Sequence, residues 1–364
     1  MASLYSYRTA DSSKKITTYV YHNKYFNFAF DFGSNDISIN DIKEIDYIFI
    51  SHEHMDHFLG LLNMDYAEAL LKNKCEIYAS NVTKDLLIAL FENVYRVDLD
   101  KKQTRTIREL LNSIKGVLFF EKYNLNKHAY FRIFPSGHTF GSAMIYLHDE
   151  EHKILYTGDI DFSLDDSDRQ YQLDLKEDET IDYVIADGTY LDSETFKDEE
   201  FTQVRDNILY KKFNNFYCKP EKIVFFSKKL LSSAKLKDKY CVVFSSEFKW
   251  YLEILKKYSY DPFIVDQIVL ESSLYYLPEK RIPLRVSSKK KDKQSNVTSL
   301  VGLHISFLDF AYMLQPPYMD SSKTTILVGH YNEENKQDIL DTFHYSDITS
   351  DYKVVVLHKG EYKL

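Results

Sequence analysis

The chain has 364 residues, enough for one large or two medium domains, and 44% of them are hydrophobic, as in globular proteins. Its formal net charge of −9 argues against a wide basic surface for nucleic acid, so any such contact would be local. Cys75, Cys218 and Cys241 lie far apart without a C-x-x-C pair, which excludes a disulfide framework and a thiolate zinc site.

The first residues of the chain lack the apolar segment of a signal peptide, and no apolar run reaches the length of about 18 residues that a membrane span needs. We therefore expect no membrane partner and an intracellular protein, either cytoplasmic or nuclear.

Strand and helix patterns alternate along the first half of the chain. Apolar and aromatic residues predict strands within 17–32, with a turn near 22–24, and at 47–50, 76–79, 117–120 and 129–134. Helical periodicity predicts helices at 59–71, 82–95 and 105–114. This alternation predicts a layered α/β architecture.

The strongest chemical signal directly follows the strand at 47–50. His52, His54, Asp56 and His57 stand within six residues of one another, and histidine nitrogen and aspartate oxygen suit zinc and related metals. His52 and His54 can converge on one ion while Asp56 and His57 turn to a second. The alternative is a solvated polar turn, but four ligand-type residues at this spacing rarely coincide.

Further ligand-type residues stand where later strands are expected to end. His138 lies between glycines after the strand at 129–134, and Asp159 follows a strand at 153–156. Asp187, His330 and His358 end apolar runs that begin near residues 182, 324 and 353. Between residues 195 and 318 we expect further α/β elements, among them a helix at 200–213 and strands at 222–226 and 240–244, without a comparable cluster.

The pattern H-x-H-x-D-H at 52–57 resembles the metal-binding motif of the metallo-β-lactamase superfamily. The stretch G-H-x-x-G-S-A-M at 137–144 resembles the third motif in the form typical of the β-CASP branch. That branch includes the nuclease of mRNA 3′-end processing, ribonuclease J and the Artemis-type nucleases. The resemblance implies a four-layer αββα sandwich formed by 1–190 and 320–364, with 195–318 as an inserted α/β, β-CASP-like domain.

The resemblance also implies roles for individual residues. His52, His54 and His138 would hold one divalent metal ion, and Asp56, His57 and His358 a second, with Asp159 bridging the two. Zinc is favoured over manganese as the metal. Asp31, which closes the strand before Gly33, would support the site from behind, although a plain turn role explains it equally well.

The remaining two residues suggest acid catalysis. His330 lies outside the ligand set above and could protonate the leaving oxygen, with Asp187 orienting its ring. We therefore expect Asp56, Asp187 and His330 to be the catalytic residues. Several features depart from the branch: Gly188 replaces the Ser or Thr of motif A, residues 328–332 fit motif B poorly, and Lys359 interrupts motif C.

Taken together, these patterns favour a metal-dependent nuclease, in which two metals share a hydroxide that attacks a phosphodiester. RNA is slightly favoured over DNA because Artemis-type enzymes lack the histidine corresponding to His358, and partners in a processing complex are expected. A small-molecule hydrolase needs only the metal residues and suits the acidic charge. A catalytically silent scaffold subunit is the third alternative, and the intact H-x-H-x-D-H pattern opposes it. The basic run at 287–293 is either a solvated loop or a phosphate contact.

Overall fold

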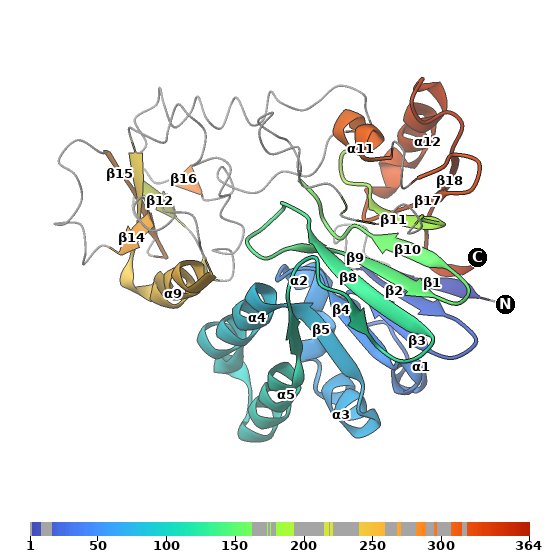
Figure 1. Ribbon diagram of the computed structural model, residues 1–364. Coiled ribbons are helices and arrows are strands. Elements are labelled where there is room, and N and C mark those ends of the chain that lie inside the picture. The colour runs from blue at the N-terminus through green and yellow to red at the C-terminus, as the bar shows by residue number, and fades with distance from the viewer. Residues whose placement is uncertain are drawn as a thin grey trace. The chain divides into compact units, whose positions relative to one another are not determined.

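The computed structural model describes residues 2–8, 17–161, 173, 175, 180–192, 215–217, 219–220, 240–258, 268–270, 282–288, 295–296, 307–314 and 319–364. The chain divides into two compact units (Figure 1). The first comprises Met1–Lys84, Leu99–Phe196 and His304–Leu364, and the second comprises Asp85–Asp98 and Lys197–Leu303. These units differ from the expected domains at two places: residues 85–98 group with the later segment, and residues 304–318, expected in the inserted domain, group with the first unit.

Two seven-stranded sheets form the framework of the first unit. In spatial order, the first sheet consists of β19 (Gly360–Lys363), β1 (Ser3–Arg8), β2 (Thr17–His22), β3 (Asn27–Phe30), β4 (Tyr47–Ile50), β5 (Glu76–Ser80) and β6 (Lys115–Val117). The second consists of β18 (Lys353–Val356), β17 (Thr325–Gly329), β11 (Tyr183–Asp187), β10 (Lys153–Tyr156), β9 (Ala143–Asp149), β8 (Ala129–Pro135) and β7 (Tyr123–Asn124).

The two sheets share one aromatic-rich core. Phe49 of the first sheet is 1% exposed, and its ring centroid lies 4.9 Å from that of Phe131 in the second sheet. Tyr78 packs against Phe131 at the same centroid distance of 4.9 Å. Burial of such rings removes a large apolar area from water and supplies much of the free energy that holds the sheets together.

Helices accompany both sheets within the first unit. The helical segments are α1 (Ile39–Glu44), α2 (Met55–Phe58), η1 (Leu59–Leu62), α3 (Met64–Asn73), the start of α4 (Asn81–Asn93), α5 (Lys101–Ser113), α11 (Phe307–Met313), η7 (Glu333–Asn335) and α12 (Lys336–Tyr345). The rest of α4, from Asp85, and the whole of η2 (Tyr95–Asp98) belong to the second unit. In Figure 1, α1, α3 and α5 lie beside the first sheet on the side away from the second. Phe310 and Phe343, from α11 and α12, belong to a separate core cluster with second-sheet residues.

The second unit contains a smaller five-stranded sheet with all its pairings parallel. Its order is β14 (Ile268–Leu270), β13 (Tyr240–Phe244), β15 (Ile282–Ser287), β12 (Asn215–Tyr217) and β16 (Ser295–Asn296). The short η4 (Ser246–Phe248) leads into α9 (Lys249–Tyr258). The expected helix at 200–213, the strand at 222–226 and most of the basic run at 287–293 lie outside the described residues.

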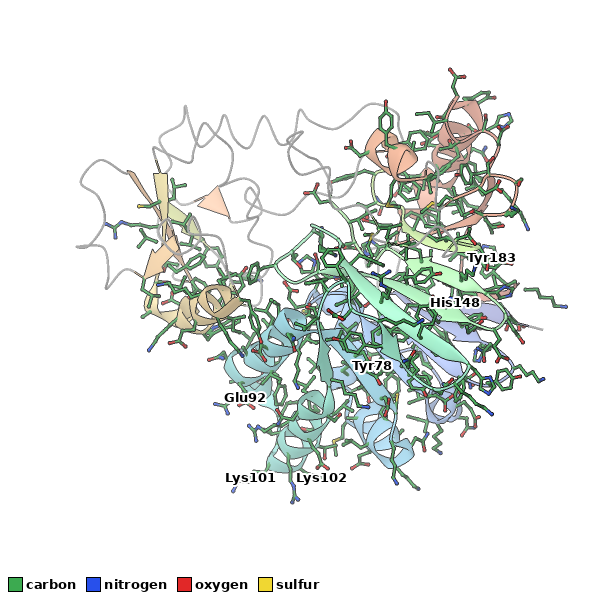
Figure 2. All side chains as sticks on the ribbon, in the orientation of Figure 1. Tyr78, Glu92, Lys101, Lys102, His148 and Tyr183 are labelled. Carbon is green, nitrogen blue, oxygen red and sulfur yellow. The ribbon has the colours of Figure 1, made fainter. Side chains whose placement is uncertain are left out.

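The predicted α/β class is confirmed, and element boundaries differ where capping decides them. The helix expected at 59–71 is interrupted at Asn63, whose side chain accepts hydrogen bonds from the Asp65 and Tyr66 amides and starts α3. Helix α5 begins four residues early because Asp100 and Gln103 form a capping box. Lys101 and Lys102 of its first turn extend into solvent (Figure 2). In the part of the chain that is described, no helix combines the length and apolar character needed to cross a membrane.

Candidate metal centre

The ends of several strands converge on one site in the first unit. Strand β4 leads into the loop that carries His52 and His54, and the short helix α2 follows with Asp56 and His57. In the second sheet, β10, β11 and β17 run parallel, so their carboxyl ends meet at one edge. These ends deliver Asp159, Asp187 and His330.

The first group of ligand atoms belongs to His52, His54, His138 and Asp159, all buried and all within 4.8 Å of one another. The Nε2 atoms of His52 and His138 lie 3.7 Å and 3.5 Å from Oδ2 of Asp159. Burial, reinforced by the neighbouring histidines, holds the pKa of His52 and His54 well below the ordinary value. Both rings are therefore neutral, which is the form that binds metals.

The second group contains Asp56, His57 and His330, and it merges with a third made of Asp159, Asp187 and His330. His57 Nε2 lies 3.3 Å from Asp159 Oδ1 and 3.8 Å from Asp56 Oδ2. His330 Nε2 lies 3.2 Å from Asp56 Oδ2. Its Nδ1 lies 3.2 Å from Asp159 and 3.4 Å from Asp187.

The carboxylates control the charge of this second group. Burial by itself lowers the pKa of His330, but Asp159, Asp187 and Asp56 outweigh it and raise that pKa to about 9. The same balance, with Asp159, Asp31 and Asp56 opposing burial, raises the pKa of His57 well above its ordinary value. Several buried carboxylates together require compensating positive charge. Protons on His57 and His330 supply it in the metal-free protein, and divalent cations can replace those protons.

The donor atoms fit metal ions. Among the residues that the structure describes, the Nε2 atoms of His52 and His57 are buried and have no hydrogen-bond partner. A buried polar atom without a partner costs about 1–3 kcal/mol, unless something fills the role. Because both nitrogens face clusters of carboxylates and imidazoles, a borderline divalent cation such as zinc is the natural occupant.

The structure brings together all the predicted site residues except His358. That side chain is exposed, and its Nδ1 lies 2.8 Å from the hydroxyl of Tyr362. His358 belongs to none of the potential metal groups found among the described residues. The reason is sheet order: β18 is the edge strand, whereas β17 pairs directly with β11, so His330 reaches the centre in place of His358.

The position of Asp31 agrees with the supporting role inferred for it. Its buried carboxylate lies 2.6 Å from Nδ1 of His57 and accepts a hydrogen bond from the Ser51 amide at 2.7 Å. The Asp31 backbone has a φ of 56°, a left-handed conformation that few residues other than glycine adopt. Such conformations persist only where the surroundings enforce them, and they gather at functional sites.

Sequence reasoning missed three polar residues around the centre. Ser51 bonds to both Asp31 and His52, Tyr156 donates to Asp31, and the Thr189 hydroxyl lies 3.1 Å from Nδ1 of His330. Each stands next to or near a motif residue at the end of a strand, which was the available signal. Glu53, between the first two histidines, is also buried, and burial raises its pKa to about 8.

The chain is similar in sequence to one family model and to several known proteins. A family model described as "Anti-Pycsar protein Apyc1" matches residues 29–187. The chain is 27% identical over 150 residues to an RNase J-like protein of Methanocaldococcus jannaschii, covering 41% of this chain and 33% of that protein. It is 28% identical over 175 residues to cleavage and polyadenylation specificity factor subunit 3-II of Arabidopsis thaliana, covering 46% and 27%.

Integrator complex subunit 11 of Danio rerio is 23% identical over 168 residues, covering 44% of this chain and 27% of that protein. The chain therefore spans about a third or less of the length of these relatives. A crystal structure of a protein of unknown function from Enterococcus faecalis V583 shares the fold, with a TM-score of 0.54 and 14% identity over 100% of both chains.

The chain is an α/β protein with a histidine and aspartate centre at the ends of its strands. Its relatives name the family to which this centre is similar. They confirm the resemblance of this chain to the β-CASP branch of the metallo-β-lactamase superfamily.

Proposed function

We propose that this chain is a metal-dependent nuclease that hydrolyses phosphodiester bonds, with RNA favoured over DNA. The observation that carries the proposal is the pair of adjoining ligand groups, in each of which histidine nitrogens and carboxylate oxygens lie within 4.8 Å of one another. The names of the RNase J-like relative and of the cleavage and polyadenylation factor support nucleic acid as the substrate. They also support partners in a processing complex and an intracellular location.

The proposed architecture follows the same resemblance. The two sheets and their flanking helices would form the four-layer αββα sandwich of the superfamily, built from residues 1–190 and 320–364. The smaller parallel sheet would be the core of an inserted β-CASP-like domain, which would end before α11 and not at the expected residue 318, because α11 packs with the second sheet. A shared core between the two large sheets and a second core beneath α11 and α12 support this layering.

We assign two divalent cations to the centre, with zinc favoured because imidazole nitrogens are prominent in the ligand set. His52, His54 and His138 would hold the first, and Asp56, His57 and His330 the second. Asp159 would lie between them, since its two oxygens face the two groups separately. Two such cations lower the pKa of water and stabilise the charge that develops on a phosphoryl group.

This assignment gives His330 a different role from the general acid suggested by the sequence. Its ring stands in the second group, where the motif comparison had placed His358. Asp187 and Thr189 contact its Nδ1, as carboxylates and hydroxyls commonly do behind a ligating histidine. Asp56 has the most exposed side chain of the second group, at 31%, so substrate would approach from its side.

A second candidate is hydrolysis of a small phosphodiester. The net charge of −9 favours it, because a long polyanion would be repelled by much of the protein surface. The exposed position of His358 also removes the one sequence feature that leaned toward RNA. A silent scaffold is the weakest alternative, since the ligand groups are complete.

The deciding experiment compares substrates on one metal-loaded preparation. Labelled RNA, single-stranded DNA, duplex DNA and the small chromogenic diester bis(p-nitrophenyl) phosphate are each incubated with zinc-loaded and manganese-loaded protein. Cleavage of RNA that is abolished by His54→Ala and retained by His358→Ala supports the proposal. Cleavage of the small diester alone supports the second candidate, and no cleavage by protein with full metal content refutes both.

A further inference from the structure

We propose that Asp31, Ser51 and Tyr156 form one buried hydrogen-bond network that positions a histidine at each metal position, so that a single carboxylate supports the binding of both ions. This inference rests on the proposed two-metal centre. Ser51 and Tyr156 would position ligands of that centre, and these roles are tested by metal affinity and not by turnover.

The carboxylate of Asp31 is fully buried and accepts from donors on three sides. Its Oδ1 accepts from the Ser51 amide at 2.7 Å. Its Oδ2 accepts from the Ser51 hydroxyl at 2.7 Å, is contacted by His57 Nδ1 at 2.6 Å, and accepts from the Tyr156 hydroxyl. Both oxygens therefore face donors, which is the arrangement that stabilises a buried carboxylate.

The Ser51 hydroxyl extends this network to the first metal position. A hydroxyl has one hydrogen, and here it is donated to Asp31. His52 Nδ1, which lies 2.9 Å from the same oxygen, must therefore be the donor in their contact. The proton of the neutral His52 ring is thus fixed on Nδ1, which leaves the lone pair on the buried Nε2 directed at the first group.

Asp31 also fixes the position of the proton on His57, in this case by direct contact. A carboxylate can only accept, so His57 Nδ1 keeps its proton in the contact with Asp31. Its Nε2 is the atom that must face the second position, and that atom is also buried without a hydrogen-bond partner. One carboxylate thus fixes the orientation of two rings that belong to different ligand groups.

Packing holds the network in place. A Cβ atom added at Gly158 would lie 2.7 Å from Cβ of Ser51, so the Thr157–Asp159 turn presses directly on the serine. Tyr156 lies three residues before Asp159, and its ring packs 5.3 Å from that of Phe30, the residue before Asp31. The network therefore connects the ends of strands from both sheets.

The hydrogen bonds of the network determine how each substitution should change metal affinity. Loss of a partner behind a metal-binding histidine typically weakens metal affinity by about 10–100-fold. Ser51→Ala should weaken the first ion by about that factor and the second ion much less. Asp31→Asn should weaken both, because its amide group places N–H atoms against donors whichever way it is flipped, while asparagine still tolerates the left-handed backbone. Tyr156→Phe should weaken both by a smaller factor.

Zinc affinities of the full chain are measured by competition with a chromogenic chelator, and cobalt loading is followed by its visible absorption, which reports coordination. Ser346→Ala, a buried serine at the end of α12, is the matched control and should leave both affinities unchanged. The decisive arm uses His57→Ala, which removes a ligand of the second position. In that background, Asp31→Asn should still weaken the remaining ion about as much as Ser51→Ala does, and the two changes together should add little more.

Unchanged affinity in Ser51→Ala, or an effect of Asp31→Asn confined to one ion, would overturn the inference. A wild-type chain that binds no zinc or cobalt would overturn it as well. These outcomes are separate from failure of the proposed nuclease function, which would appear as absent cleavage by protein whose two metals bind as described.

Discussion

The substitution His330→Ala separates two roles that this residue could have in the second ligand group. As a ligand, its loss should remove one ion from the protein, whereas a general acid could be removed without loss of metal. The structure favours the ligand role, because the imidazole lies 3.2 Å from both Asp56 and Asp159. We therefore expect His330→Ala to bind the first ion normally and the second weakly.

The size of the effect can be worked out from the ligand set. Structural zinc sites bind with about 10–16 kcal/mol of free energy. Divided over the four protein ligands of the second position, His330 accounts for about 3 kcal/mol, or about 100-fold in dissociation constant. Hydrolysis should fall by at least the same factor under limiting metal.

The measurement is metal content after dialysis against a series of buffered zinc concentrations, with turnover of the accepted substrate recorded in parallel. His358→Ala provides the matched control, since this exposed histidine lies outside the ligand groups. Two tightly bound ions in His330→Ala, together with turnover reduced by about 10²–10⁴-fold, would refute the ligand role and restore the general acid. Retention of both metal and turnover would refute either role.

Four further predictions concern pH, packing and metal removal. Metal binding must displace a proton from His330, whose pKa is raised to about 9, and from His57, whose pKa is also raised, so apparent zinc affinity should rise with pH at least as far as about 9, as measured by calorimetry. In the metal-free protein the sign is opposite: the raised pKa contributes stability that is full below 6.5 and is lost as pH rises through about 9, which thermal melts will show. Gly33→Ala would place its Cβ 1.7 Å from the Asp56 carbonyl oxygen, so the second ion should bind less tightly while the first is spared; equal weakening of both would contradict this. Chelation should lower the thermal midpoint, since a ligand at about 100 times its dissociation constant stabilises the folded state by about 2.7 kcal/mol, and an unchanged midpoint would show that no ion was held.

Part of the centre could be predicted because its ligands are contiguous or follow recognisable strands. His52, His54, Asp56 and His57 occupy one loop and the start of one short helix, so local chemistry alone identifies them. Asp159 follows a strand whose apolar pattern is plain. In these cases sequence distance and spatial distance agree.

The role of His330 could not be predicted in the same way. His330 and His358 both follow apolar strands that pair in parallel, and their sequence contexts look alike. What separates them is that β17 lies next to β11 and β18 lies at the edge, a property of the sheet order that a single sequence does not contain. The left-handed φ of 49° that directs His330 has no sequence signal either.

Missed elements have local explanations. Strand β9 begins at Ala143, inside the stretch at 137–144 that resembles the third motif, so the motif hides the start of the strand. Strands β1 and β19 pair with each other from the two ends of the chain, so neither end alone predicts the partnership. The early start of α5 was readable from Asp100 and Gln103, which form a recognisable capping box.

The strand ends that meet at the centre also bear on how the molecule assembles. The contact between Asp56 and His330 joins residues 274 positions apart. Asp56 follows a strand of the first large sheet, and His330 follows a strand of the second. The entropy lost in closing so long a loop must be recovered by the aromatic core before any ion can find its ligands together. Metal should therefore bind last in folding. Once bound, it would link the edges of the two sheets and slow unfolding more than it speeds folding.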